Sequence, residues 1–256
     1  WAEGFMGVMV FDSRVVVQDS TFRGGRDGVY THRSHGLVVR DNHMTGLRFG
    51  VHEMYTSDAL VENNTVRDAN VGVIVMTRPV GNVLVDNDVR GSRAGLSVAG
   101  GASYVSGNLV TDNGYGLLLP SRRSIYERNV IVGNEIGIRS STLIPTNRIT
   151  ANDFAANDRH VLAVLGPLRI WPANYWAGLP GRDRDGDGTI DRPFRPSGVV
   201  DGRVHRVAGT PTLARSPAVA AIRSLQALVP GLRSTGVLDP EPRTTPVRPA
   251  AMDRVT

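Results

Sequence analysis

The chain has 256 residues, of which 41% are apolar and 6% aromatic, so it can form one large or two small domains around an aliphatic core. It contains no cysteine, which excludes disulfides, thiolate zinc sites and cysteine nucleophiles. The net charge is +5, but the arginines are scattered without interleaved aromatic residues, so we expect no nucleic-acid partner. No stretch approaches the roughly 18 to 20 apolar residues of a membrane span, so we do not expect an integral membrane protein.

Two residue types recur with one period of about 22 residues. Glycine before a strand-forming residue stands at Gly7, Gly28, Gly50, Gly72, Gly95, Gly116 and Gly137. Asparagine keeps the same spacing at Asn42, Asn64, Asn87, Asn108, Asn129 and Asn152. Each unit holds three short β-rich runs with turn residues between them. This pattern predicts an all-β fold over residues 1–166, a right-handed parallel β-helix of about seven coils. We expect the asparagines to adopt the left-handed conformation and to hydrogen-bond their stacked equivalents.

Stacked coils lie about 4.8 Å apart, so equivalent positions form columns along the solenoid. The first and third residues after each glycine are mostly aliphatic, with Glu53 as the exception. These two columns are predicted to face inward. Met44 is also assigned to the core. The second and fourth residues then face outward, and in the first four coils these two columns contain His32, His52, Met54, Met76 and Met9.

Imidazole and thioether donors without thiolate suit copper, and Cu(I) in particular. The outward columns therefore predict a surface copper site formed by a subset of those five residues. The residues alone leave an alternative open, in which the same side chains form an apolar patch beneath a loop or a partner and methionine fills gaps.

Residues 167–196 are predicted to cap the solenoid. Their sequence resembles the first half of an EF-hand loop, although Phe194 stands where the final glutamate would be. We expect a structural calcium loop, with a bare polar turn as the alternative. Its ligands would be Asp183, Asp185, Asp187, the backbone of Thr189, and Asp191.

The remaining chain divides into two predicted segments. Within residues 197–240, an apolar stripe over 214–229 predicts a helix that caps the solenoid or docks on a partner. Residues 241–256 are rich in proline and arginine and are predicted to be disordered.

One run, RFGVHEMYT at Arg48–Thr56, resembles the NosD family, which are extracytoplasmic accessory proteins of nitrous oxide reductase maturation. The stretch from Asn174 to Phe194 and the helix start Ser216–Val219 resemble that family as well. Glu53 departs from the aromatic residue that the family pattern would place between His52 and Met54.

The resemblance implies a periplasmic or otherwise extracytoplasmic chain, whose signal peptide is absent from this sequence. It implies copper supply to the copper site of nitrous oxide reductase. It also implies work with the permease and ATPase subunits of an ABC transporter, and exchange with a copper chaperone and the apo-reductase. Contact with the membrane would come only through the transporter, and the His and Met positions would be the copper contacts.

We expect no catalysis, but two other functions stay open. Polysaccharide lyases and epimerases also have parallel β-helix folds. A set of polar residues in this sequence could form a catalytic site of that kind, with Glu53 as a base. The members of that set are Asp27, Tyr30, His32, His52 and Asp58. Methionines in place of aromatic platforms and paired carboxylates argue against it. The other alternative is a metal-blind scaffold or adaptor, whose Met patch is a protein interface.

Overall fold

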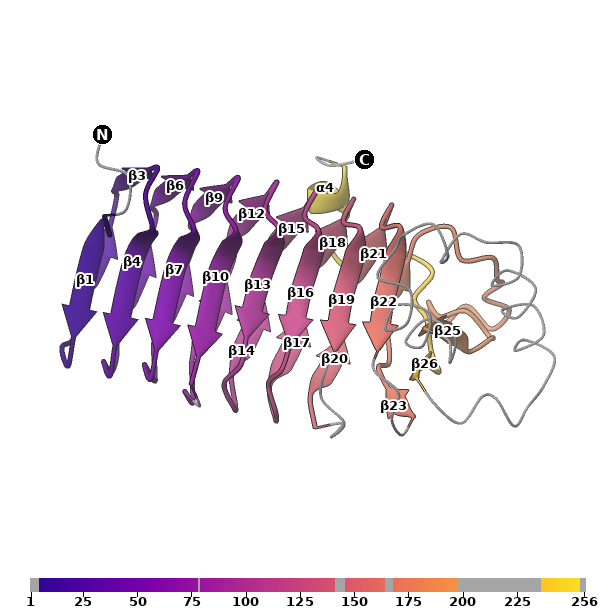
Figure 1. The fold of residues 1–256 in the computed structure, drawn as a ribbon. Coiled ribbons are helices and arrows are strands. Elements are labelled where there is room, and N and C mark those ends of the chain that lie inside the picture. Colours follow the sequence, from indigo (N-terminus) through magenta and orange to yellow (C-terminus); the bar gives the residue numbers. More distant parts are fainter. Residues whose placement is uncertain (1–4, 78, 141–145, 164–167, 198–235, 254–256) are drawn as a thin grey trace, which may run out of the picture.

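A computed structural model describes residues 5–77, 79–140, 146–163, 168–197 and 236–253 of the chain. Their strands form three long parallel sheets along one axis, so the chain winds as a parallel β-helix (Figure 1). The second of these sheets holds seven strands, one from each coil. This confirms the predicted all-β solenoid of about seven coils.

Each of the seven complete coils contributes one strand to each sheet, the first and third sheets have one further strand, and neighbouring coils pair in parallel. The first sheet contains β1 (Val8–Phe11), β4 (Asp27–His32), β7 (Phe49–Met54), β10 (Val71–Met76), β13 (Ala94–Val98), β16 (Tyr115–Leu119), β19 (Ile136–Ser140) and β22 (Arg159–Ala163). The second contains β2 (Val16–Gln18), β5 (Val38–Arg40), β8 (Leu60–Glu62), β11 (Val83–Val85), β14 (Tyr104–Ser106), β17 (Ile125–Glu127) and β20 (Arg148–Thr150). The third contains β3 (Thr21–Arg23), β6 (His43–Thr45), β9 (Thr65–Arg67), β12 (Asp88–Arg90), β15 (Leu109–Thr111), β18 (Val130–Val132), β21 (Asp153–Ala155) and β24 (Tyr175–Trp176).

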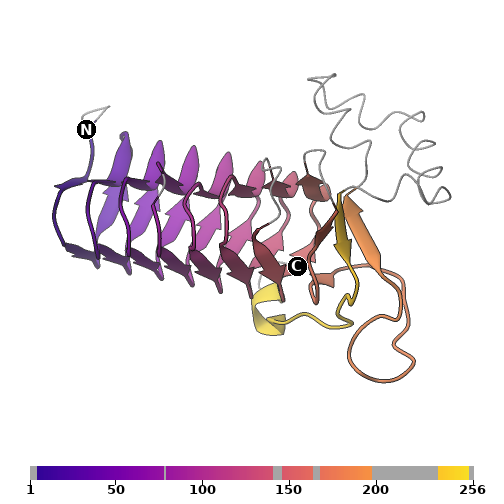
Figure 2. The same cartoon turned by 90° about the horizontal axis from the view of Figure 1, so that it is seen from below.

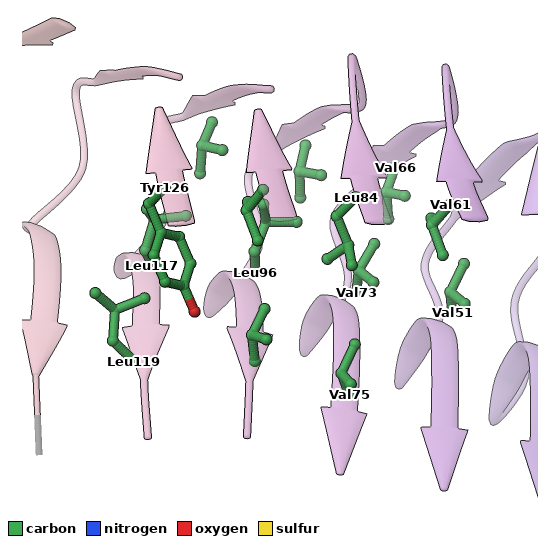
Figure 3. Close-up of a cluster of buried hydrophobic side chains, with 14 of the residues drawn as sticks. Val51, Val61, Val66, Val73, Val75, Leu84, Leu96, Leu117, Leu119 and Tyr126 are labelled. Carbon is green, nitrogen blue, oxygen red and sulfur yellow. The ribbon is translucent and has the colours of Figure 1, made fainter. Parts of the chain in front are cut away.

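The interior is a stack of aliphatic side chains. Val51, Val73, Leu96 and Leu117 are register partners in consecutive coils, and all four are fully buried (Figure 3). Met44 is also fully buried, which confirms its assignment to the core. Because each coil buries its apolar side chains against its neighbours, the solenoid is stabilised coil by coil.

The recurring glycine marks a close approach between coils. A Cβ atom at Gly50 would lie 2.5 Å from the carbonyl oxygen of Gly72, and one at Gly72 would lie 2.7 Å from that of Gly95. No larger residue fits there without a shift of the backbone. Each coil therefore needs one glycine at this position, so the spacing of the glycines in the sequence equals the number of residues in a coil.

The recurring asparagine forms a buried ladder at the corner between the second and third sheets. Each Nδ2 donates to the Oδ1 of the next asparagine at 2.9–3.1 Å, from Asn42 to Asn174. The predicted stacking is confirmed, but the left-handed conformation falls on the residue before each asparagine. Asp41 has φ +56° and Gly107 has φ +69°. The turn is completed before the asparagine, whose amide then points into the corner and bonds backbone groups there.

A small sheet closes the C-terminal end. It consists of β23 (Arg169–Ile170), β26 (Val237–Asp239) and β25 (Phe194–Ser197). Because β24 still pairs with β21, the solenoid continues past the predicted boundary at residue 166. The helix predicted at 214–229 lies outside the described residues.

The buried Asp239 carboxylate joins this cap to the last coil. It accepts hydrogen bonds from the backbone N–H groups of Ala173 and Asn174 at 3.1 and 3.0 Å, and from the Trp176 indole at 2.8 Å. The Trp176 ring stacks on Phe154, with centroids 4.3 Å apart. The last rung of the asparagine ladder is thus held in place by the cap.

We predicted disorder over residues 241–256, but residues 241–253 run back along the solenoid and end in α4 (Pro249–Met252), which lies beside the third sheet (Figure 2). The Asp153 carboxylate accepts the N–H groups of Val247 and Arg248 at 2.7 and 2.8 Å. Met252 packs against Val130 and its neighbours. These partners are about a hundred residues distant in sequence, so composition did not indicate them.

The ladder predicts a large loss of stability when one rung is removed. Asn108→Ala deprives the Leu84 carbonyl, the Asn87 N–H and the Asn129 side chain of a buried partner. The free energy of unfolding, measured by urea denaturation, should fall by roughly 3 kcal/mol. Asn70→Ala, at an exposed asparagine, is the matched control. Equal stability of the two variants would contradict the role of the ladder.

Candidate functional site

The register of the first sheet places the predicted donors in two adjacent columns. Met9, Tyr30, His52 and Ile74 are consecutive partners in one column. Phe11, His32, Met54 and Met76 are partners in the other. The residues between them, such as Thr31, Glu53 and Val75, are fully buried. The predicted outward columns are therefore confirmed, and we call the outer surface of these first four coils the His/Met face.

Tyr30 joins two of the candidate donors on the His/Met face. Its hydroxyl lies 3.3 Å from His32 Nδ1 and 3.6 Å from Met54 Sδ. Its ring meets the His52 ring edge-on, with centroids 5.0 Å apart. His32, His52 and Met54 therefore surround one phenol, which the sequence had grouped only with the alternative enzyme site.

His52 is held by a buried carboxylate. Its Nδ1 lies 2.9 Å from Asp27 Oδ2, and the Arg48 guanidinium bonds both Asp27 oxygens at 3.0–3.2 Å. Asp27 is fully buried and His52 is 5% exposed. Burial lowers the pKa of His52, although the bond to Asp27 opposes this effect. The imidazole is thus neutral near pH 7, and its buried Nε2 has no hydrogen-bond partner in the part of the chain that the structure describes.

Met9 and Met76 lie at the two ends of the group, in the first and fourth coils. Met9 is 54% exposed, and Phe11 and Tyr55, whose rings both contact the His32 ring, are 49% and 52% exposed. Such an apolar surface is also what a protein interface requires. The structure therefore brings His32, His52 and Met54 together around Tyr30, while Met9 and Met76 extend the columns on either side.

These donors fit copper as a bound cargo. A neutral imidazole whose Nε2 has no partner among the described residues, and a thioether that contacts the same Tyr30 side chain, are the ligand types that Cu(I) prefers. A carboxylate behind the ligating histidine is the usual outer partner in metal sites.

Among the residues grouped for the alternative enzyme, Asp27 and His52 form a carboxylate–imidazole pair with 2.9 Å between Asp27 Oδ2 and His52 Nδ1. The Asp27 carboxylate is engaged by Arg48 and His52, and Asp58 lies in an exposed turn. Glu53, the predicted base, faces the interior of the solenoid, opposite to His52 on the same strand.

Glu53 instead forms a polar contact inside the core. Its Oε2 accepts a hydrogen bond from Asn82 Nδ2 at 2.6 Å, and its Oε1 has no partner among the residues of the described ranges. Burial raises the pKa of Glu53 to about 8, with the Asn82 bond opposing the rise. The carboxyl group is therefore neutral at pH 7.

The predicted calcium loop has a compact arrangement of carboxylates. Oxygen atoms of Asp183, Asp185 and Asp187 lie within 4.8 Å of one another. Asp183 accepts the N–H groups of Gly186 and Gly188 at 2.7 and 2.9 Å. The fourth predicted carboxylate, Asp191, accepts a hydrogen bond from the Arg184 N–H at 2.9 Å. The backbone of Thr189 forms an isolated antiparallel β-bridge with Arg243.

Comparison with known proteins identifies the family. A sequence model described as "Periplasmic copper-binding protein (NosD)" matches residues 6–180, which is more than half of the chain. The chain belongs to the NosD family. The matched region contains the whole His/Met face and ends before the aspartate loop, so the resemblance found in the sequence is confirmed.

A curated relative supports the same assignment. The NosD-family chain is 28% identical over 187 residues to the "Probable ABC transporter binding protein NosD" of Stutzerimonas stutzeri. The match covers 70% of this chain and 41% of the relative, so the chain spans less than half of that protein's length. Among the described residues, no helix has the length and apolarity needed to cross a membrane.

Glu53 predicts a pH dependence of stability in this NosD-family chain. Its pKa is about 8 in the folded chain against an ordinary value of 4.5. The contribution of the neutral Glu53 carboxyl group to the free energy of unfolding is therefore fully present below pH 4.5. That stabilisation is lost between pH 4.5 and 8, by roughly 1 kcal/mol per pH unit. In the copper-free Glu53→Gln variant, the free energy of unfolding measured by urea denaturation should not show this decline with pH.

The matched control is Glu135→Gln, at an exposed glutamate, which should retain the decline. A Glu53→Gln profile parallel to that of the wild-type chain would show that Glu53 is not a neutral acid in the fold.

Proposed function

We propose that this chain binds Cu(I) on the His/Met face and passes it on as an extracytoplasmic accessory protein. The observation that carries the proposal is the buried His52 Nε2, which has no hydrogen-bond partner among the described residues, on an imidazole that contacts the same Tyr30 side chain as His32 and Met54. The family description, periplasmic and copper-binding, supports the cargo and the compartment.

The arrangement suits transient binding. His32 and Met54 each share the Tyr30 hydroxyl, so copper would take over contacts that one phenol now makes. Met9 stands at the exposed edge of the group, where an incoming or outgoing partner could exchange ligands with the ion. No covalent chemistry is needed for such a transfer, and we propose that the chain is not an enzyme.

The proposed partners follow from the family. The relative is named as a binding protein of an ABC transporter. We propose that this chain likewise works with a transporter permease and ATPase, receives copper from a chaperone and serves the apo form of nitrous oxide reductase. A metal-blind adaptor is the second candidate, and the exposed Met9, Phe11 and Tyr55 support it.

Copper binding is tested by anaerobic Cu(I) titration against a competing chelator. The His52→Ala/Met54→Leu double variant should bind Cu(I) about 100-fold more weakly than the wild-type chain, since it loses two donors. His43→Ala removes an exposed histidine of the third sheet and should bind normally. Unchanged affinity in the double variant would exclude the site, and capture of a partner without copper would favour the adaptor.

We also propose that the aspartate loop binds Ca²⁺ and stabilises the C-terminal cap. Its support is the three carboxylates within 4.8 Å and the contacts of Gly188 and Thr189 with the segment near Arg243. Calcium should raise the melting temperature by about 2–4 °C over chelator-treated protein.

The increase should vanish in Asp185→Asn/Asp187→Asn. It should persist in Asp68→Asn/Asp86→Asn, which removes two exposed corner carboxylates. A melting temperature that is indifferent to calcium in the wild-type chain would rule out this loop as a calcium site.

A further inference from the structure

We infer that Asp27 is a positioning residue that fixes His52 in the tautomer with a bare Nε2, and so makes His52 the preformed imidazole donor of the His/Met face. This inference rests on the proposed copper function. It assigns a role to a carboxylate that does not itself face the cargo.

The hydrogen-bonding pattern determines the tautomer. Two of the contacts of Asp27 are charge-assisted bonds from Arg48 to Oδ1 at 3.0 and 3.2 Å, and a third reaches Oδ2 at 3.2 Å. A carboxylate paired with arginine is ionised and accepts hydrogen bonds only. His52 Nδ1, 2.9 Å from Asp27 Oδ2, must therefore carry the proton and donate it. The lone pair of the neutral ring is then on Nε2.

The surroundings keep that lone pair without a partner. The His52 ring lies edge-on to Tyr30 and to Phe49, with centroids 5.0 and 4.7 Å away. Nε2 is buried and accepts no hydrogen bond among the described residues. A buried polar atom without a partner costs free energy, which a ligand at Nε2 would recover.

The strand geometry explains why Asp27 can reach His52. A Cβ atom on Gly28 would point at Met44 and Leu47 in the core, and the next residue, Val29, is also fully buried. Two successive positions thus face inward, so Asp27 lies on the outer side of the strand. It can then bond a histidine in the next coil.

Nitrogen NMR of the chain with ¹⁵N-labelled histidine tests the tautomer directly. In the copper-free wild-type chain, His52 should show a protonated Nδ1 and an unprotonated Nε2. In Asp27→Asn, the asparagine oxygen turns to Arg48 and its N–H₂ group faces Nδ1, so the proton should move to Nε2. Cu(I) affinity should fall 10–100-fold, the usual cost of losing an outer-shell partner.

The matched control is Asp88→Asn. It breaks an Asp–Arg pair with Arg67 across two coils of the third sheet, at 2.5 Å, with no histidine attached. This variant should retain the wild-type tautomer and affinity. Equal losses of Cu(I) affinity in both variants would show that Asp27 contributes only to the stability of the fold.

The remaining outcomes separate the two proposals. A wild-type His52 protonated on Nε2 overturns the positioning role even if Asp27→Asn fails to fold. Wild-type affinity in Asp27→Asn also overturns it but leaves the copper site intact. Failure of the wild-type chain to bind Cu(I), with the expected tautomer present, overturns the proposed function instead.

Discussion

The coil-to-coil hydrogen-bond register governs the rest of this molecule. Every strand of the three long sheets pairs in parallel with its equivalent in the neighbouring coil. A slip of one residue in any coil would turn its valines outward and its polar residues into the core. The glycine contacts and the asparagine ladder maintain the register, because each requires its partner at one fixed position in the next coil.

The same register creates the His/Met face. His32, Met54 and Met76 are about 22 residues apart in sequence, yet they stand on adjacent strands as partners in one column. A β-helix can therefore collect donors on its surface without shaping a cavity. The buried Asp27 and the bridging Tyr30 then distinguish three of these side chains from an ordinary row of surface residues.

The fold could be predicted from the sequence because glycine and asparagine each mark a packing constraint that recurs once per coil. The outward columns followed from simple alternation along the strand. Alternation fails at Gly28, however, and for that reason Asp27 was grouped with His52 only for the alternative enzyme and not as the carboxylate behind a metal ligand. The bonds of Asp153 to Val247 and Arg248 link segments distant in sequence, so the ordered tail was missed as well.

The central claim is that imidazole and thioether groups from separate coils bind one copper ion together. X-ray absorption spectroscopy of the chain loaded anaerobically with one equivalent of Cu(I) tests it most directly. The account predicts a first shell that contains both sulfur and nitrogen neighbours. A shell of nitrogen and oxygen alone, with no sulfur, would contradict it.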